Sequence, residues 1–199
     1  MPTNGVVGQI FHKKVYNRQY LRNGVSCGKK NRHYRLSHYK KHNCENYPTH
    51  DLGPIAKILG INRGNRMLRL VSCASKARGL HEYIKTHKPN DNDLLNTRFK
   101  QGDIVTTIIT CENGETITLT LDTTLPRIYS RSFTIHGTKG MYQEDGDYVF
   151  LEKDFTGNIS EIDTNPQLIW KNAEKYAEEY DNDLWKHKSK GMLESGHGG

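Results

Sequence analysis

The sequence contains no long hydrophobic run. Apolar residues make up 34% of its 199 residues, and the mean hydropathy is −0.80. A helix that crosses a bilayer needs about 20 consecutive apolar residues, and no stretch of the chain approaches that length. The first residues also lack the charged and then apolar layout of an export signal. The sequence therefore predicts a soluble, single-domain product with a modest core, contacting no membrane, and it leaves the compartment open.

Cysteine is sparse. The four cysteines, at positions 27, 44, 73 and 111, are widely spaced and form no C-x-x-C pair, which excludes a dense disulfide framework and predicts reduced thiols. His38, His42 and Cys44 fall close enough to suggest zinc. Their spacing matches no closed zinc pattern, however, so solvated loop histidines are the preferred interpretation and no metal site is predicted.

Acidic residues are nearly absent from the first quarter of the chain. Residues 1–50 contain ten lysines and arginines and a single acid, Glu45, whereas the whole chain has a net charge of +7. Four tyrosines are interleaved with these cations, a composition that could bind nucleic acid. No helix-turn-helix, zinc-finger or RNA-recognition pattern accompanies it, so nucleic-acid binding is a disfavoured alternative.

Alternation of β-branched and polar residues predicts a sheet. The clearest signal is a hairpin, with strands over 104–111 and 116–122 joined by an Asn-Gly turn. Threonines alternate with aliphatic residues there, which predicts one buried face and one polar face. The polar face could meet a sugar, a partner subunit or only solvent. Further strands are expected over 6–16, 66–74, 131–137, 140–144 and 147–152.

Helices are expected between and after these strands. Residues 17–46 have no period and predict a long basic loop, and 88–102 predict a polar connection. The helices are expected over about 50–60, 77–86 and 166–180, the last with an amphipathic stripe.

Residues 47–54 place a phenol, an imidazole and a carboxylate within five positions, beside two prolines and a glycine. If Thr49 caps the following helix, His50 lies in its first turn; if Gly53 caps it, His50 lies on the entering loop. Either way His50 is near a helix N-terminus, where the dipole favours the neutral imidazole. It could act as a base near neutral pH, or it could be a helix-start histidine without chemistry.

Several motifs resemble one known family, the NAD-dependent α-N-acetylgalactosaminidases of glycoside hydrolase family 109, within the Gfo/Idh/MocA oxidoreductase superfamily. The similarity extends in collinear order from about residue 5 to the last residue. The motifs that carry it lie at 31–35, 43–50, 53–56, 61–66, 74–77, 101–103, 113–116, 122–127, 137–140 and 196–199.

The resemblance implies a fold, a cofactor and partners. The fold is α+β: an open-faced antiparallel sheet with helices on one side, as in the family's C-terminal part, lacking the N-terminal Rossmann domain. Residues 1–199 would form one substrate-binding and catalytic domain, truncated at both ends. NAD is the implied cofactor, but neither Gly5–Gly8 nor Gly60–Gly64 has the spacing of a dinucleotide-binding turn. The implied partners are an N-acetylhexosamine-type glycan, a nucleotide-binding domain of the same polypeptide, and a second subunit through the sheet face.

The mechanism that the resemblance implies is oxidation at the sugar's C3, elimination of the glycosidic group, addition of water and re-reduction. His50 would transfer the proton, and Tyr47 would support it. The residues implied to bind the substrate are Arg35, Tyr47, Pro48, Thr49, His50 and Tyr129.

One position departs from the family. After the first strand the family has a Gly-Gly-Tyr-x-His-Asp-Leu-Arg run, and Asn17 stands where its tyrosine is expected. Either Tyr16 replaces that tyrosine after a one-residue slip, which would turn it to the other face of a strand, or the contact is lost. The alternatives to a glycosidase are thus a sugar-binding or oligomerisation module without chemistry and, third, a nucleic-acid binder. Activity, anomeric preference, aglycone and oligomeric state stay open.

Overall fold

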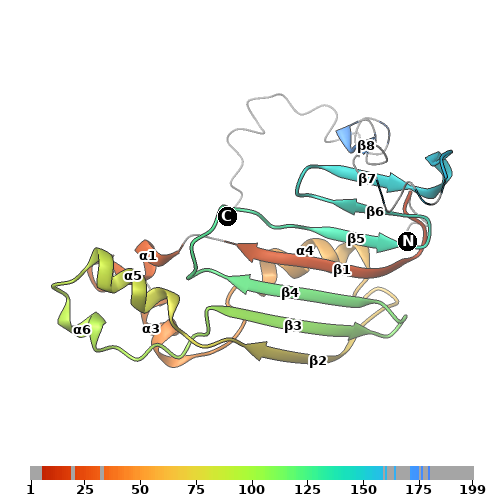
Figure 1. Cartoon of the computed structure of the whole chain (residues 1–199). Coiled ribbons are helices and arrows are strands. Elements are labelled where there is room, and N and C mark those ends of the chain that lie inside the picture. The colour runs from red at the N-terminus through yellow and green to blue at the C-terminus, as the bar shows by residue number, and fades with distance from the viewer. Residues whose placement is uncertain are drawn as a thin grey trace.

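The computed structural model describes residues 6–18, 21–31, 34–158, 160, 164, 171–174, 176 and 179. Its centre is an eight-stranded sheet in the order β2-β3-β4-β1-β5-β6-β7-β8 (Figure 1). Neighbouring strands pair antiparallel except β1 and β4, which are parallel. The predicted α+β class with a mostly antiparallel open sheet is confirmed. The strands are β1 (Ile10–Arg18), β2 (Met67–Ala74), β3 (Ile104–Cys111), β4 (Thr116–Asp122), β5 (Thr134–Gly137), β6 (Gly140–Gln143), β7 (Tyr148–Leu151) and β8 (Lys171–Asn172).

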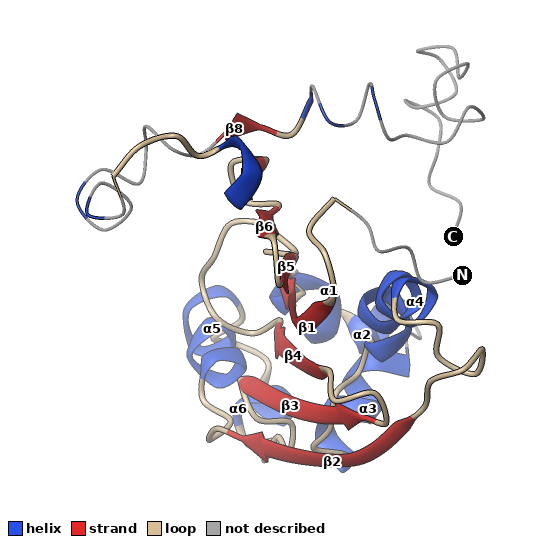
Figure 2. Ribbon diagram, turned by 90° about the vertical axis from the view of Figure 1, so that its right-hand side faces the viewer, coloured by secondary structure: helices blue, strands red, loops and turns tan. Residues whose placement is uncertain are grey.

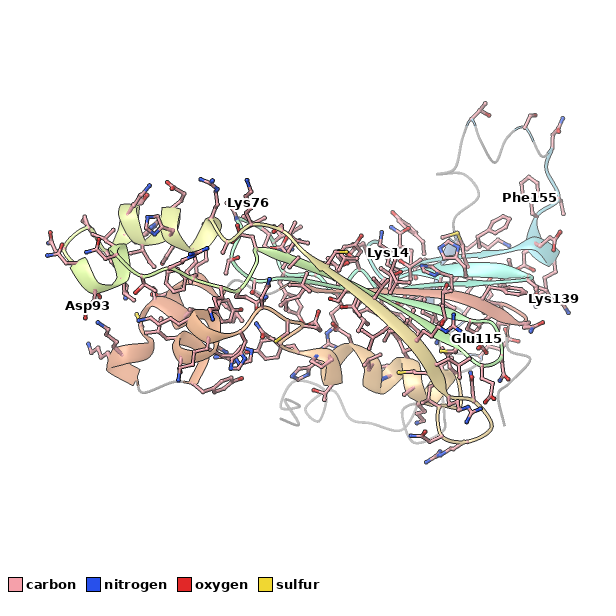
Figure 3. The ribbon with its side chains drawn as sticks, turned by 90° about the horizontal axis from the view of Figure 1, so that it is seen from below. Lys14, Lys76, Asp93, Glu115, Lys139 and Phe155 are labelled. Carbon is pink, nitrogen blue, oxygen red and sulfur yellow. The ribbon has the colours of Figure 1, made fainter. Side chains whose placement is uncertain are left out.

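The longest helix, α4, covers one face of the sheet (Figure 3). Each apolar side chain buried there contributes roughly 1.5–3 kcal/mol. Figure 2 shows the strands turning from β2 towards β6, the usual twist of such a sheet. The helices are α1 (Arg22–Ser26), α2 (Gly28–Asn31), α3 (Tyr34–Lys41), α4 (Pro48–Ile58), α5 (Gly79–His87) and α6 (Asn92–Leu95), with a 3-10 turn at Glu152–Asp154. The α4 core consists of Val15, Ile55, Leu59, Ile109, Cys111, Ile117 and Leu119.

The expected hairpin is confirmed as β3 and β4. Their register pairs Thr110 with Thr116 and Ile109 with Ile117. Gly114 has a φ of 92°, the left-handed conformation that an Asn-Gly turn supplies. Alternation then directs the aliphatic residues of β4 to α4 and its threonines to the opposite face.

The predicted loop over 17–46 is wrong, because α1, α2 and α3 lie within it. These helices join α5 and α6 in a lobe beyond the end of the sheet (Figure 1). No helix of the three has more than eight residues, too few for a clear 3.6-residue period, so tertiary packing decides their structure. The hydrophobic core of this lobe consists of Val25, Leu36, Tyr39, Leu80, Ile84, Leu94 and Phe99.

The amphipathic helix expected over 166–180 is confirmed only in part: Glu174, Tyr176 and Glu179 are helical, whereas residues 171–172 are not. Lys171 and Asn172 form β8, paired with β7. Most of the remaining range, with Trp170, lies outside the described residues, as does Trp185. Within the described ranges, no helix is both long and apolar enough to cross a membrane.

Candidate functional site

The first turn of α4 positions the predicted proton-transfer residue. Tyr47 is the N-cap and Pro48 the first helical residue, so neither Thr49 nor Gly53 caps the helix. His50 therefore lies in the first turn. Pro54 lies inside the helix, and because proline has no N–H it cannot donate the usual hydrogen bond to the carbonyl of His50.

Arg35, Tyr47 and His50 form one cluster. Arg35, on α3, donates a hydrogen bond from Nε to the phenol oxygen of Tyr47. The Tyr47 and His50 rings are tilted by 38° with centroids 5.9 Å apart. Two helices separated by a short loop thus bring together a cation, a phenol and an imidazole.

Tyr47 is held in its protonated form. Burial raises the pKa of Tyr47 to about 12, and its hydrogen bond with Tyr34 adds to the effect, whereas the Arg35 guanidinium opposes it. The backbone N–H of Tyr47 donates to Glu45 Oε1 at 3.1 Å. At neutral pH the Tyr47 phenol is therefore a hydrogen-bond donor rather than a base.

A cavity of about 210 Å³ opens beside His50. Asp51 lies in it with only 3% of its surface exposed, and burial, then the negative charge of Glu45, raises the pKa of Asp51 to about 7, against the opposing charge of Arg131. One of its carboxylate oxygens, Oδ2, has no hydrogen-bond partner among the described residues. The cavity is lined by Val15, His50, Asp51, Pro54, Arg131, Phe133, Tyr142 and Glu144.

Sequence reasoning missed three polar residues of this cavity, Arg131, Tyr142 and Glu144. They come from the segment after β4 and from around β6, 81 to 94 positions after His50. No local pattern connects them to it. The only local signal was the carboxylate of Asp51 next to the histidine.

The other predicted substrate-binding residues lie at different depths. Pro48 is half-buried and Thr49 exposed in the first turn of α4. Tyr129 is 65% exposed, and its phenol oxygen accepts a hydrogen bond of 3.3 Å from Nε of Arg131. Arg131 thus links Tyr129 to the His50 cavity. The side chain of Asn17 lies outside the described residues.

The threonine-rich face of the sheet is on the other side from this cavity. Val15 lines the cavity and belongs to the α4 core, whereas its neighbour Lys14 lies on the side away from α4 (Figure 3). A sugar at the His50 cavity would therefore not contact the threonine face. That the threonine-rich face forms a subunit interface stays a prediction.

His38 and His42, two of the three residues whose proximity suggests zinc, stack on each other. The His38 and His42 ring centroids are 4.6 Å apart, and Cys44 Sγ lies 3.5 Å from His38 Nε2. Among the described residues no three His, Cys, Asp or Glu side chains form a group that could hold a metal ion. All four cysteines are free.

Several cations of the N-terminal quarter are used within the fold. Lys13 is fully buried, Lys29 pairs with Asp93, and the Arg22 guanidinium lies 5.0 Å from the Tyr83 ring centroid. These three are not arranged as one open basic face, which weighs against a nucleic-acid surface over residues 1–50.

Comparison with known proteins identifies the relatives. The family model "Glycosyl hydrolase 109, C-terminal domain" matches residues 6–199. A glycosyl hydrolase family 109 protein of Stenotrophomonas maltophilia is 36% identical over all of this chain and 46% of its own length. An α-N-acetylgalactosaminidase of Tannerella forsythia is 39% identical over 83% of this chain and 33% of its own length. The chain thus spans between a third and a half of these curated relatives.

A solved NAD-binding oxidoreductase from Klebsiella pneumoniae is similar with a TM-score of 0.49 and 16% identity, over 77% of this chain and 38% of that one. That likeness is too slight to assign a ligand. The family match is stronger, since its model extends over all but the first five residues. The chain belongs to glycosyl hydrolase family 109, in the region of the family's C-terminal domain.

Proposed function

We propose that this chain is the sugar-binding and proton-transferring part of a glycosidase that acts on α-linked N-acetylgalactosamine. The observation that carries the proposal is the His50 cluster: an imidazole in the first turn of a helix, beside a protonated phenol and at the edge of a cavity that Asp51 and Arg131 also line. Family membership supports the reaction class. The name of the Tannerella forsythia relative supports the sugar.

Each residue has a role in the proposal. His50 accepts a proton from the bound sugar and returns it, as a general base and acid. Tyr47, kept protonated, donates a hydrogen bond to the sugar oxygen on which negative charge develops. Arg35 orients Tyr47. The outer wall of the sugar site is formed by Pro48, Thr49 and Tyr129.

The described residues do not fit NAD, which the family resemblance implies. A dinucleotide site places pyrophosphate at a helix N-terminus after a parallel strand and a glycine-rich turn. The helix nearest the cluster, α4, begins instead at Tyr47 and Pro48. The roles of His50 and Tyr47 therefore involve no contact between NAD and the described residues. The proposal assigns the cofactor to a nucleotide-binding domain, and residues 1–199 to one C-terminal substrate domain.

The threonine face is proposed as a contact between copies of the chain. Val71 on β2 and Ile108 on β3 are paired neighbours on this face and are 59% and 44% exposed. Exposed aliphatic neighbours on an uncovered sheet face are typical of an interface.

The test is His50→Ala, in the chain combined with a nucleotide-binding domain of a family 109 relative. With p-nitrophenyl α-N-acetylgalactosaminide as substrate, kcat should fall by at least about 100-fold, as expected for a lost general base. The matched control is His87→Ala, on α5, which should keep the wild-type rate. Full turnover by His50→Ala would contradict the assignment, and sugar binding without turnover by the wild-type combination would favour a non-catalytic module.

A further inference from the structure

A second, larger hollow lies in the helical lobe. The start of α5 and the segment over 97–100 enclose a groove of about 1,040 Å³. Figure 3 marks its rim with Lys76, at the end of the molecule opposite Lys139. Its charged lining consists of Lys76, Arg78, Glu82, Lys85, Arg98 and Lys100, together with His81.

The charge of this groove is one-sided. Five lysines and arginines face one carboxylate, Glu82, which already accepts a hydrogen bond from Lys85 at 2.9 Å. The other four cations are exposed and have no ion-pair partner within the described part of the chain. A hollow lined by charges of one sign concentrates the electric field and attracts ions of the opposite sign.

The neutral polar side chains of the groove are already engaged. Asn43 Oδ1 accepts a hydrogen bond from the Gly102 N–H, Thr97 donates to the Asp93 carbonyl, and Ser75 accepts from the Ile104 N–H. The first amides of α5 are also occupied, since the Asp103 carboxylate accepts from the N–H groups of Arg78 and Gly79. What the groove offers a ligand is therefore the positive charge of four side chains.

We propose that this groove binds the sulfate or carboxylate groups of an acidic glycan. Guanidinium groups match planar carboxylates and other oxyanions through paired hydrogen bonds. The volume reaches the upper end of the roughly 300–1,000 Å³ found for small-ligand pockets, which suits several linked sugar rings. Of the two aromatic rings in the lining, Phe99 is only 8% exposed, which leaves the His81 imidazole as the one accessible ring, a small platform for stacking nucleobases.

The choice of a glycan, rather than another polyanion, rests on the proposed glycosidase function. The groove and the His50 cavity share no lining residue. Variants of one site can therefore be made without changing the other.

The experiment is a calorimetric titration of the purified chain with three hexasaccharides: chondroitin sulfate, hyaluronan and neutral chitohexaose. Because hyaluronan carries carboxylates but no sulfates, it shows whether the groove binds carboxylates without sulfates. At least one acidic hexasaccharide should bind at least about tenfold more tightly than chitohexaose, and added salt should weaken that binding. The Lys76→Ala/Arg98→Ala double variant should weaken it by about tenfold or more.

The matched control is Lys139→Ala/Lys153→Ala, which removes the same charge at sites outside the groove and should change affinity by less than about twofold. Equal losses in both double variants, or no acidic hexasaccharide binding to the wild-type chain, would overturn the proposal. Tighter binding of oligodeoxythymidylate than of either acidic hexasaccharide would overturn it as well. Lys100→Glu, a single exposed change, provides a second variant and should weaken binding in the same way.

His50→Ala keeps the two proposals apart. It should leave acidic-glycan binding by the chain unchanged while abolishing turnover in the combined enzyme. Groove variants that lose acidic-glycan binding but keep turnover would support the groove proposal and would leave the proposed role of His50 unchanged.

Discussion

Lys13 is a buried lysine with an unusual environment. It is 0% exposed on β1, its Nζ lies 5.7 Å from the Phe133 ring centroid, and it has no hydrogen-bond partner among the described residues. Burial lowers the pKa of Lys13 to about 7. Below that pH the folded chain must hold a buried charge.

Lys13→Met should stabilise the protein near pH 6, by about 1–3 kcal/mol, because the charge is removed and the apolar stem is kept. The gain should shrink as the pH rises from about 7 towards 10, since the wild-type side chain is then neutral when folded and loses its proton in the unfolded chain near pH 10.4. Urea unfolding near pH 6 and near pH 10 measures this gain in the free energy of unfolding. Lys14→Met, one residue along on the other face, is the control; a similar gain there would contradict the explanation.

Asp51 gives the opposite pH dependence. Its pKa is raised by burial to about 7, so in wild type the stabilisation is present below about pH 4 and is lost as the pH rises through 7. Asp51→Asn should raise the free energy of unfolding by about 1–2 kcal/mol near pH 8 and by almost nothing near pH 4. The exposed control Glu152→Gln should change it by less than about 0.5 kcal/mol at both. Equal gains for Asp51→Asn at the two pH values would refute this prediction.

At the scale of elements, Asp103 connects α5 to the sheet. Its carboxylate accepts hydrogen bonds from the Arg78 and Gly79 N–H groups at 2.7 and 2.9 Å and from Thr124 Oγ1 at 2.7 Å. The residue is 6% exposed, so water would not readily replace its carboxylate as the acceptor for these donors. The start of α5, and with it the rim of the basic groove, depends on this one side chain.

Asp103→Ala should therefore cost on the order of 2–4 kcal/mol, because buried donors lose a charged acceptor. Asp103→Asn, which keeps one acceptor oxygen, should cost less. Thermal and urea unfolding followed by circular dichroism give both values. Asp93→Ala, which removes an exposed carboxylate paired with Lys29, is the control and should cost clearly less than Asp103→Ala, because solvent screens exposed ion pairs; a larger loss there than at Asp103 would be inconsistent with this role.

Elements differ in how well local sequence predicts them. The β3–β4 hairpin combines strict alternation with an Asn-Gly turn, and both signals lie within 20 residues. The helix α5 was expected for the same reason, from Leu80, Tyr83 and Ile84. The short helices α1 to α3 were missed, because α1 contributes only Val25 and α3 only Leu36 and Tyr39 to a core shared with α5 and α6, and α2 contributes no residue to it.

At the scale of the whole molecule, the described residues form two cores, one under the sheet and one in the helical lobe. We expect it to unfold cooperatively and to bind no NAD at micromolar concentrations, because the described residues form no dinucleotide-binding turn. Calorimetric titration with NAD, after circular dichroism has established folding, measures this. An NAD-dependent dehydrogenase serves as the positive control, and micromolar binding by the chain would contradict the proposed division into two domains.

The sequence by itself determined strands β1 to β7, α4 and the residues at its start, because alternation, turn chemistry and a proline at the helix start act over a few positions. It also brought Tyr47 and His50 together, since both lie within one helical turn. Only the tertiary structure decided the parallel pairing of β1 with β4, the burial of Lys13 and the arrival of Arg131 beside Asp51. These features depend on contacts between residues about 80 to 105 positions apart, which burial in a common core selects and no local pattern encodes.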